Sequence, residues 1–237
     1  MVTRALDILR AVRFRAWALV VRARLRRLGG DLVLDVAAPP RLLGRPHVDI
    51  VGHPGTLTLR IGRDVRIGRG LVIDLAAGVD GEIVLADGVT LQDGVRLQPW
   101  GGSIRIGTSA QVRDRCELKS TGDLRLGPRC VLSRTATLHC HERIDIGARC
   151  AIAERTTIID SDHGFDGSDT FVLEQPVRST PITIGENVFI GTNAVILRGT
   201  VVGDRAVIAA GAVLNGGDFP AAHIVAGVPA RTLRALG

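Results

Sequence analysis

The sequence predicts an all-β solenoid, in which short strands wind into stacked coils with three flat sides. One observation is an interior almost without rings, because 46% of the 237 residues are hydrophobic but only 3% are aromatic. Another is a tetrad in which two aliphatic residues enclose one outward residue and glycine follows. The tetrad occurs at residues 59–62, 104–107, 124–127, 144–147 and 182–185, and three copies are spaced 20 residues apart. Such self-similarity is typical of a repeat architecture.

A shorter period of six residues runs inside these coils. Aliphatic residues recur at this spacing in three series: Ile61, Ile67 and Ile73; Val79, Leu85, Leu91 and Leu97; and Ile184, Ile190, Ile196, Val202, Ile208 and Leu214. Compact residues stand four positions after many such aliphatic positions: Val65, Val89, Val95, Ala110, Cys116, Cys130, Ala136, Cys150, Thr156, Val188, Ala194, Thr200, Ala206 and Ala212. We therefore expect one aliphatic and one compact side chain to point inward on each side. The Gly, Asp or Asn after the aliphatic residue is expected to serve a corner with unusual backbone dihedrals.

Composition and charge narrow the function classes. Charged residues make up 23% of the chain, and the mean hydropathy of +0.24 excludes a disordered chain. The net charge of +6 is local, because residues 1–30 hold eight arginines and one aspartate, which leaves 22 basic and 23 acidic residues in 31–237. A nucleic-acid partner is therefore not expected. Four cysteines without a cleavable signal segment are typical of reduced packing thiols and of a cytoplasmic protein.

Residues 1–30 predict one basic amphipathic helix that ends at Gly29 and Gly30. Its longest stretch without charge, residues 16–21, is far shorter than the roughly 20 apolar residues that a membrane span requires. Two placements remain open. The helix can pack across the open end of the solenoid, or it can lie on an anionic membrane surface as a peripheral contact at the inner face.

The repeat resembles a known family. The six-residue pattern across residues 57–215, its interruption at 164–180, and the ending IVAGVPAR at 224–231 are similar to the left-handed β-helix acyltransferases, in the branch of maltose, galactoside and polysaccharide O-acetyltransferases. The resemblance implies a left-handed parallel β-helix over 31–222, behind the helix of 1–30 and before a short tail of 223–237. It also implies a homotrimer with active sites between neighbouring prisms.

The interruption indicates the candidate catalytic site. The interval between tetrads rises from 20 to 38 residues there, so about 18 residues leave the prism, and long loops on rigid scaffolds tend to carry function. His163 stands at the root of this loop, and the resemblance implies that it is the catalytic base. Asp160 or Asp162 could orient the ring, and the sequence does not choose between them. Residues 132–135 lack the Asn that helps to hold the acceptor in the family.

The resemblance also implies a site for acetyl-CoA along the groove between prisms. The small residues expected to let the pantetheine arm approach the backbone are Ala153, Gly191, Thr192, Ala209 and Ala210. Arg231 and Arg234 match the basic positions that meet the nucleotide phosphates. Phe189 stands where the branch usually has Trp.

Two other function classes remain as alternatives. His139, His141 and His163 suggest a zinc hydratase similar to the γ-class carbonic anhydrases, although alternate residues of a strand point to opposite faces. A non-catalytic scaffold is the second alternative. We expect instead an O-acetyltransferase that moves an acetyl group from acetyl-CoA to a hydroxyl of a sugar or glycan precursor, in polysaccharide biosynthesis and without a metal.

Overall fold

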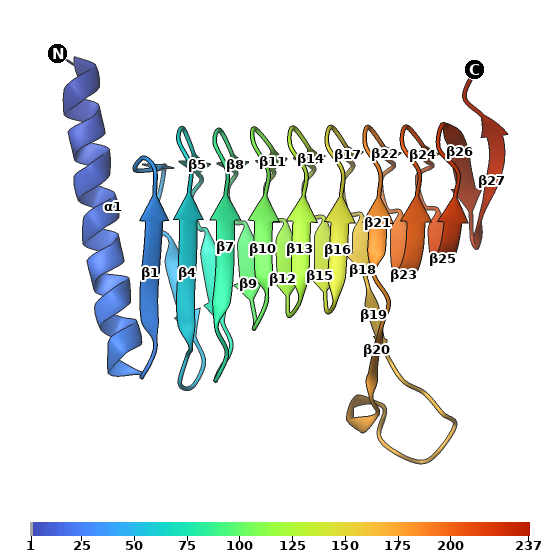
Figure 1. Ribbon diagram of the computed structural model, residues 1–237, viewed down its shortest axis with the longest axis horizontal. Coiled ribbons are helices and arrows are strands. Elements are labelled where there is room, and N and C mark those ends of the chain that lie inside the picture. Colours follow the sequence, from blue (N-terminus) through green and yellow to red (C-terminus); the bar gives the residue numbers. More distant parts are fainter. Residues whose placement is uncertain (1) are drawn as a thin grey trace.

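The protein is a single helix followed by a parallel β-solenoid of about nine coils (Figure 1). The computed structural model describes the backbone of residues 2–237 and the side chains of residues 8–237. Helix α1 (Val2–Arg27) stands beside the first coil, and the coils follow in chain order towards the C-terminus. The predicted fold class is confirmed, and the three-sided coils are consistent with the left-handed winding that the family resemblance implies.

Each coil has three faces, and on each face the strand of one coil pairs in parallel with that of the next. The first face contains β1 (Asp31–Val36), β4 (Thr56–Ile61), β7 (Gly81–Leu85), β10 (Ser103–Ile106), β13 (Asp123–Leu126), β16 (Arg143–Ile146) and β21 (Ile182–Ile184). The second face contains β2 (Arg41–Leu42), β5 (Arg66–Ile67), β8 (Thr90–Leu91), β11 (Gln111–Val112), β14 (Val131–Leu132), β17 (Ala151–Ile152), β22 (Phe189–Ile190), β24 (Val207–Ile208), β26 (His223–Gly227) and the antiparallel β27 (Ala230–Ala235). The third face contains β3 (His47–Ile50), β6 (Val72–Leu75), β9 (Arg96–Pro99), β12 (Glu117–Ser120), β15 (Thr137–Cys140) and β18 (Thr157–Ile159).

The last two long strands join the first and third faces. β23 (Val195–Val202) pairs with β18 at its start and with β21 at its end, and β25 (Val213–Phe219) follows the same path one coil later. The solenoid also begins earlier than the repeat, because the coil that starts at Asp31 already pairs with residues 56–61. At the other end, residues 223–237 add β26 and β27 to the second face.

The six-residue pattern describes the core correctly. Every compact residue expected to point inward is buried, at 1% exposure or less. The aliphatic series is confirmed with one exception: Val79 is 39% exposed, because it lies in the turn between β6 and β7. The four cysteines are free and buried. Burial raises the pKa of Cys116 to about 11 and that of Cys140 to about 12, so both stay protonated packing groups at neutral pH.

The tetrad glycines serve the corner for a reason other than the one expected. Gly127 and Gly147 are not at positive φ, but a Cβ on either would lie about 2.5–2.6 Å from the backbone of the next coil. The left-handed conformation falls two residues later, on Arg129 and Arg149. Glycine is therefore needed where successive coils approach most closely, while non-glycine residues adopt the unusual dihedrals.

Helix α1 packs across the open end of the solenoid, as one of the two predicted placements requires. Its buried side contributes Phe14, Trp17, Ala18, Val21 and Leu25 to the core. Its polar groups bind carbonyls of the first coil: the Trp17 indole donates to Pro46 at 2.9 Å, Arg24 donates to Val48 at 2.9 Å, and Arg22 donates to Leu32 at 2.7 Å. The helix thus covers apolar side chains and satisfies acceptors that the first coil would otherwise leave unpaired.

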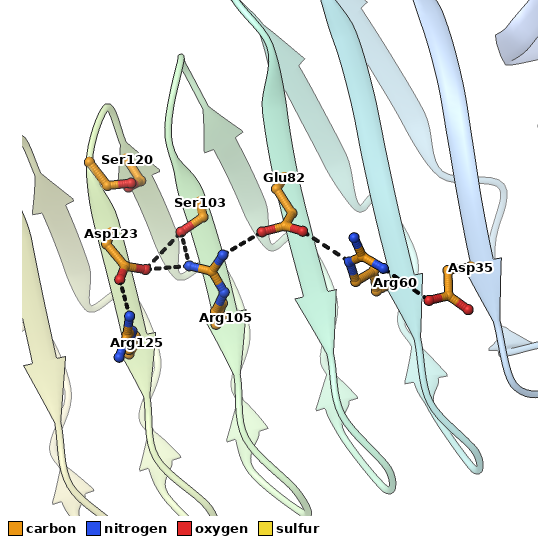
Figure 2. A network of polar contacts seen from close by, with 9 residues as sticks. Asp35, Arg60, Glu82, Ser103, Arg105, Ser120, Asp123 and Arg125 are labelled. Carbon is orange, nitrogen blue, oxygen red and sulfur yellow. Dashed lines mark hydrogen bonds and ion pairs between the residues drawn. The ribbon is translucent and has the colours of Figure 1, made fainter.

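A ladder of opposite charges crosses the outside of the first face, one coil at a time (Figure 2). Its members are Asp35, Arg60, Glu82, Arg105, Asp123 and Arg125, with Ser103 bonded to Asp123 and Arg105. Glu82 is central, because its two oxygens receive Arg60 on one side and Arg105 on the other. Coil registry places each charge next to its opposite, so that the ladder favours the in-register stack.

We expect Glu82→Gln to lower the free energy of unfolding by about 0.5–1 kcal/mol at low ionic strength. The substitution keeps the shape of the side chain but removes the charge between two arginines. The loss should shrink as salt is added, because these groups are partly exposed and screened. Chemical denaturation at low and high ionic strength measures the effect. A loss that does not change with salt would contradict an electrostatic origin.

Candidate active site

The interruption is an arm that projects from the solenoid between the third and first faces (Figure 1). Strands β19 (Ser161–His163) and β20 (Val177–Ser179) form an antiparallel hairpin, and the 3₁₀ turn η1 (Val172–Glu174) lies beyond it. The excursion therefore begins three residues before the expected 164–180 and has regular structure. Its start is set by Asp160, the last residue that points inward.

Asp160 fixes the root of the arm. Its carboxylate is completely buried, and it accepts backbone N–H bonds from His141 at 2.6 Å and from Glu142 and Arg143 at 2.8 Å. Both oxygens are therefore used by the neighbouring coil. The structure does not bring Asp160 to His163, and its role is to hold the turn from which the arm departs.

Surface pairs brace the same root from outside. Arg198 donates to Asp162 at 2.7 Å, and the Ser179 hydroxyl donates to Glu142 at 2.8 Å. Asp162 is adjacent to His163 on one strand, so their side chains point to opposite sides of the hairpin, and the Asp162 carboxylate meets Arg198 instead. The sequence carried no signal for Arg198 or Glu142, because each lies about one coil away from the arm residue that it holds.

His163 is the exposed imidazole of the arm. It lies opposite Val177 on the hairpin, and its ring has no hydrogen bond or ion pair within the part of the chain that the structure describes. An imidazole presented in this way is accessible to a group from outside the chain, and can take a proton from it and return it.

The predicted donor residues lie together on the second face and its next corner. Ala153, Gly191 and Ala209 directly follow β17, β22 and β24, and each donates its N–H to the coil after it at 2.8–2.9 Å. Thr192 and Ala210 come next in the same corner. A Cβ on Gly191 would lie 2.5 Å from the backbone nitrogen of Ala210, so this glycine is required by coil packing itself.

Two arginines lie at the C-terminal end of the face that carries this row of small residues. β27 lies at the end of the second face, where Arg231 is in register with Ala226 and Arg234 with Ile224. Both arginines are exposed and donate to the nearby backbone carbonyls of Ala230 and Ala235.

Phe189 lies on the same face. It is 48% exposed and stacks in register between Ala151 and Val207 of the neighbouring coils. The second face therefore gathers an exposed ring, a row of small residues and two guanidinium groups. A ring, a close approach to backbone, and cations are features suited to a long ligand with a phosphate end.

One chain does not bring this row to His163. The arm leaves the solenoid on the lower side of Figure 1, whereas the turns that follow the second-face strands lie along the upper side. In the coil that carries the arm, Ala153 precedes β18 and the arm follows it, so the third face separates the row from the arm. The predicted base and the predicted donor residues are on different corners of the prism.

The histidines considered for zinc do not form a ligand set. Within residues described by the structure, no three His, Cys, Asp or Glu side chains converge in a way that could hold a metal ion. His139 lies on β15 beside Lys119 of β12. Burial, and then the charge of Lys119, lowers the pKa of His139, which is the effect of packing within the third face.

Comparison with known proteins shows the family resemblance. The hexapeptide repeat of succinyl-transferase matches residues 181–215. A probable acetyltransferase of Mycobacterium tuberculosis is 30% identical over 132 residues, which are 55% of this chain and 44% of that protein. The resemblance to the hexapeptide-repeat acetyltransferases is confirmed.

Two further similarities are found. An N-acetyltransferase of Staphylococcus aureus that acts on 2,3,4,5-tetrahydropyridine-2,6-dicarboxylate is 45% identical over 60 residues, 25% of each chain. A hexapeptide-repeat acetyltransferase of Vibrio cholerae, known as a crystal structure, is 27% identical, with a TM-score of 0.45 over 65% of this chain and 73% of that one. The chain spans less than half of the length of these curated relatives.

We expect Asp160→Asn to lower the free energy of unfolding by about 2–4 kcal/mol. An amide keeps one acceptor oxygen but turns an NH₂ group towards backbone N–H donors, so at least one buried donor loses its partner. Denaturant titration measures the loss. Asp162→Asn is the matched control, because that side chain is exposed and should change stability by less than about 1 kcal/mol. Equal losses in the two variants would contradict the anchoring role of Asp160.

Proposed function

We propose that this protein is a cytoplasmic acetyltransferase that moves an acetyl group from acetyl-CoA to a hydroxyl of a sugar or glycan precursor. The observation that carries the proposal is the arm that presents His163 at the interruption of the repeat. The similarity to acetyltransferases supports the reaction class. The hydroxyl acceptor follows from the O-acetyltransferase branch that the sequence resembles, and the four free, buried cysteines support the compartment.

The proposed chemistry needs one base and a positioned donor. The neutral His163 ring removes the proton of the acceptor hydroxyl as its oxygen attacks the thioester carbonyl. The tetrahedral intermediate then collapses to the ester and expels the thiolate of coenzyme A, which receives the same proton from the imidazolium. No group other than the donor and acceptor is consumed. Holding both substrates in line with the ring supplies much of the rate enhancement.

The donor is proposed to lie along the second face. The pantetheine arm would run along the row that follows β17, β22 and β24, where small side chains leave the backbone accessible. Arg231 and Arg234 stand at the end of that row and would receive the phosphates through charge-assisted bonds. No metal takes part in this proposal.

The site is proposed to form between copies of the chain, in a homotrimer. Base and donor row lie on different corners of one prism, so that a neighbouring prism must bring its own row to the arm. The arm itself supports this assembly, because Phe165 is 77% exposed, Phe171 59% and Leu173 61%. Exposed apolar side chains gathered on one projecting segment are typical of a surface that another chain covers.

We expect His163→Ala to lower kcat by about 10²–10⁴-fold while leaving the affinity for acetyl-CoA nearly unchanged. The ring is needed for proton transfer and not for holding the donor. Calorimetric titration with acetyl-CoA gives the affinity, and release of the coenzyme A thiol in the presence of candidate sugars gives the rate. His47→Ala is the matched control, since this exposed histidine lies at the opposite end of the solenoid.

Four results would contradict the proposed function or a part of it. Absence of saturable acetyl-CoA binding would favour the scaffold, and stoichiometric zinc in the purified protein would favour the hydratase. Full activity in His163→Ala would place the base elsewhere. Transfer to amino sugars with no transfer to hydroxyls would keep the enzyme class but replace O-acylation with N-acylation.

We expect Phe171→Asp with Leu173→Asp to convert the oligomer to monomer without unfolding the solenoid. The two charges would be buried in the proposed interface but stay hydrated in a free arm. Light scattering after size exclusion measures the mass, and circular dichroism checks the fold. Leu43→Asp with Val51→Asp is the control, because both residues are exposed outside the arm. A wild-type protein that is already monomeric would contradict the assembly.

A further inference from the structure

Helix α1 has a second apolar side, opposite to the one that covers the solenoid. We call it the outer stripe, and its exposed members are Ile8, Leu9, Val12, Ala16, Leu19 and Val20. All of them except Ala16 are large and more than half exposed: Ile8 at 61%, Leu9 at 53%, Val12 at 57%, Leu19 at 67% and Val20 at 52%. At 3.6 residues per turn, this stripe runs along the side opposite to the buried Phe14, Val21 and Leu25. A helix whose only role was to close the solenoid would carry polar residues there.

Positive charge borders the outer stripe. Residues 8–27 contain seven arginines and no acidic residue. Arg13 lies along one edge of the stripe and Arg15 along the other, while Arg27 continues it at the C-terminal end. All three are exposed, and they form no hydrogen bond or ion pair with other described residues. Their charge is therefore available to an external partner.

We propose that the outer stripe binds the surface of an anionic lipid bilayer, with α1 lying in the plane of the interface. Apolar side chains enter the headgroup region, and the flanking guanidinium groups meet lipid phosphates. Charge decides between this partner and a second copy of the chain, because two stripes facing each other would bring their arginine borders together. Within residues 2–237, no helix is long and apolar enough to cross a membrane.

The packing of α1 sets the orientation of the bound protein. The same helix buries one side on the first coil and exposes the other, so docking on a surface would leave the solenoid pointing away from it (Figure 1). The arm leaves after β18, the sixth strand of the third face. At about 4.8 Å per coil, the arm would stand roughly 30 Å above the headgroups.

The test is cosedimentation of the full chain with vesicles. Vesicles of phosphatidylglycerol and phosphatidylcholine in equal parts are compared with phosphatidylcholine alone. We expect binding to the anionic vesicles, weakening as salt is added, and little binding to the neutral ones. Arg13→Gln with Arg15→Gln and Arg27→Gln should reduce the partitioning of the protein onto anionic vesicles by roughly 100-fold, because each of the three cations strengthens binding to the surface by about the same factor. Val12→Ser with Leu19→Ser should reduce it by about tenfold or more.

Matched controls distinguish the effect of the outer stripe from the effects of total charge and total exposed apolar surface. Arg63→Gln with Arg115→Gln and Arg129→Gln removes the same charge from exposed corners of the solenoid, and Val201→Ser with Leu233→Ser removes apolar groups of other faces. These controls should bind as the wild type does. Absence of binding to anionic vesicles, or equal losses in stripe and control variants, would overturn the proposal. So would a stripe variant that changes the molar mass in solution but not the vesicle binding. Titration of each variant with acetyl-CoA tests the proposed function separately, because its outcome does not depend on whether the protein binds vesicles.

Discussion

The structure depends on one constraint, the in-register stacking of each coil on the next. On each face the strands of successive coils pair in parallel and in register, as in the row Ile104, Leu124, Ile144 and Ile182. This register determines which side chains lie next to each other on the inner and outer sides of each strand. Inside, equivalent aliphatic and compact residues lie over each other, and outside, a charge such as Glu82 meets the arginines of two neighbouring coils. The same constraint requires glycine at corners such as Gly127 and Gly147, where a Cβ would meet the backbone of the next coil.

A stack of this kind can be interrupted only where the coil on either side supplies the missing contacts. Asp160 shows how this is done. The chain leaves the prism directly after it, and the backbone donors of residues 141–143 bond to its carboxylate. The arm returns in time for Ile182 to resume the register of Ile144. Asp160 is thus buried near His163 because it anchors the point where the chain leaves the prism. His163 is exposed because it lies on the arm that begins there.

The repeat in the sequence predicted the features that recur in every coil, but not the contacts that are specific to one coil. The buried set of compact residues, the three faces and the position of the arm all follow from spacing. Val79 shows the limit, because a residue at the right spacing falls in a turn when its coil is longer than the regular 20-residue repeat, and here Leu57 pairs with Gly81. The role of Asp160 was also missed, since its partners are backbone N–H groups that carry no side-chain signal. The family resemblance, and not the tetrad, predicts a solenoid that starts at residue 31, because Leu32 and Val48 of the first coil are not followed by the tetrad glycine.

The two ends of the solenoid face the same physical problem and solve it differently. The last coil covers its edge with its own chain, because β27 folds back on β26. The first coil is covered by α1, whose Trp17 and Arg24 bond to carbonyls that no earlier coil can reach. A cap needs only one apolar side. The exposed Val12 and Leu19 therefore add nothing to closure and cost solubility unless another surface covers them. Closure explains the inner side of α1, and the arginine borders indicate that the outer side is selected for a partner of opposite charge.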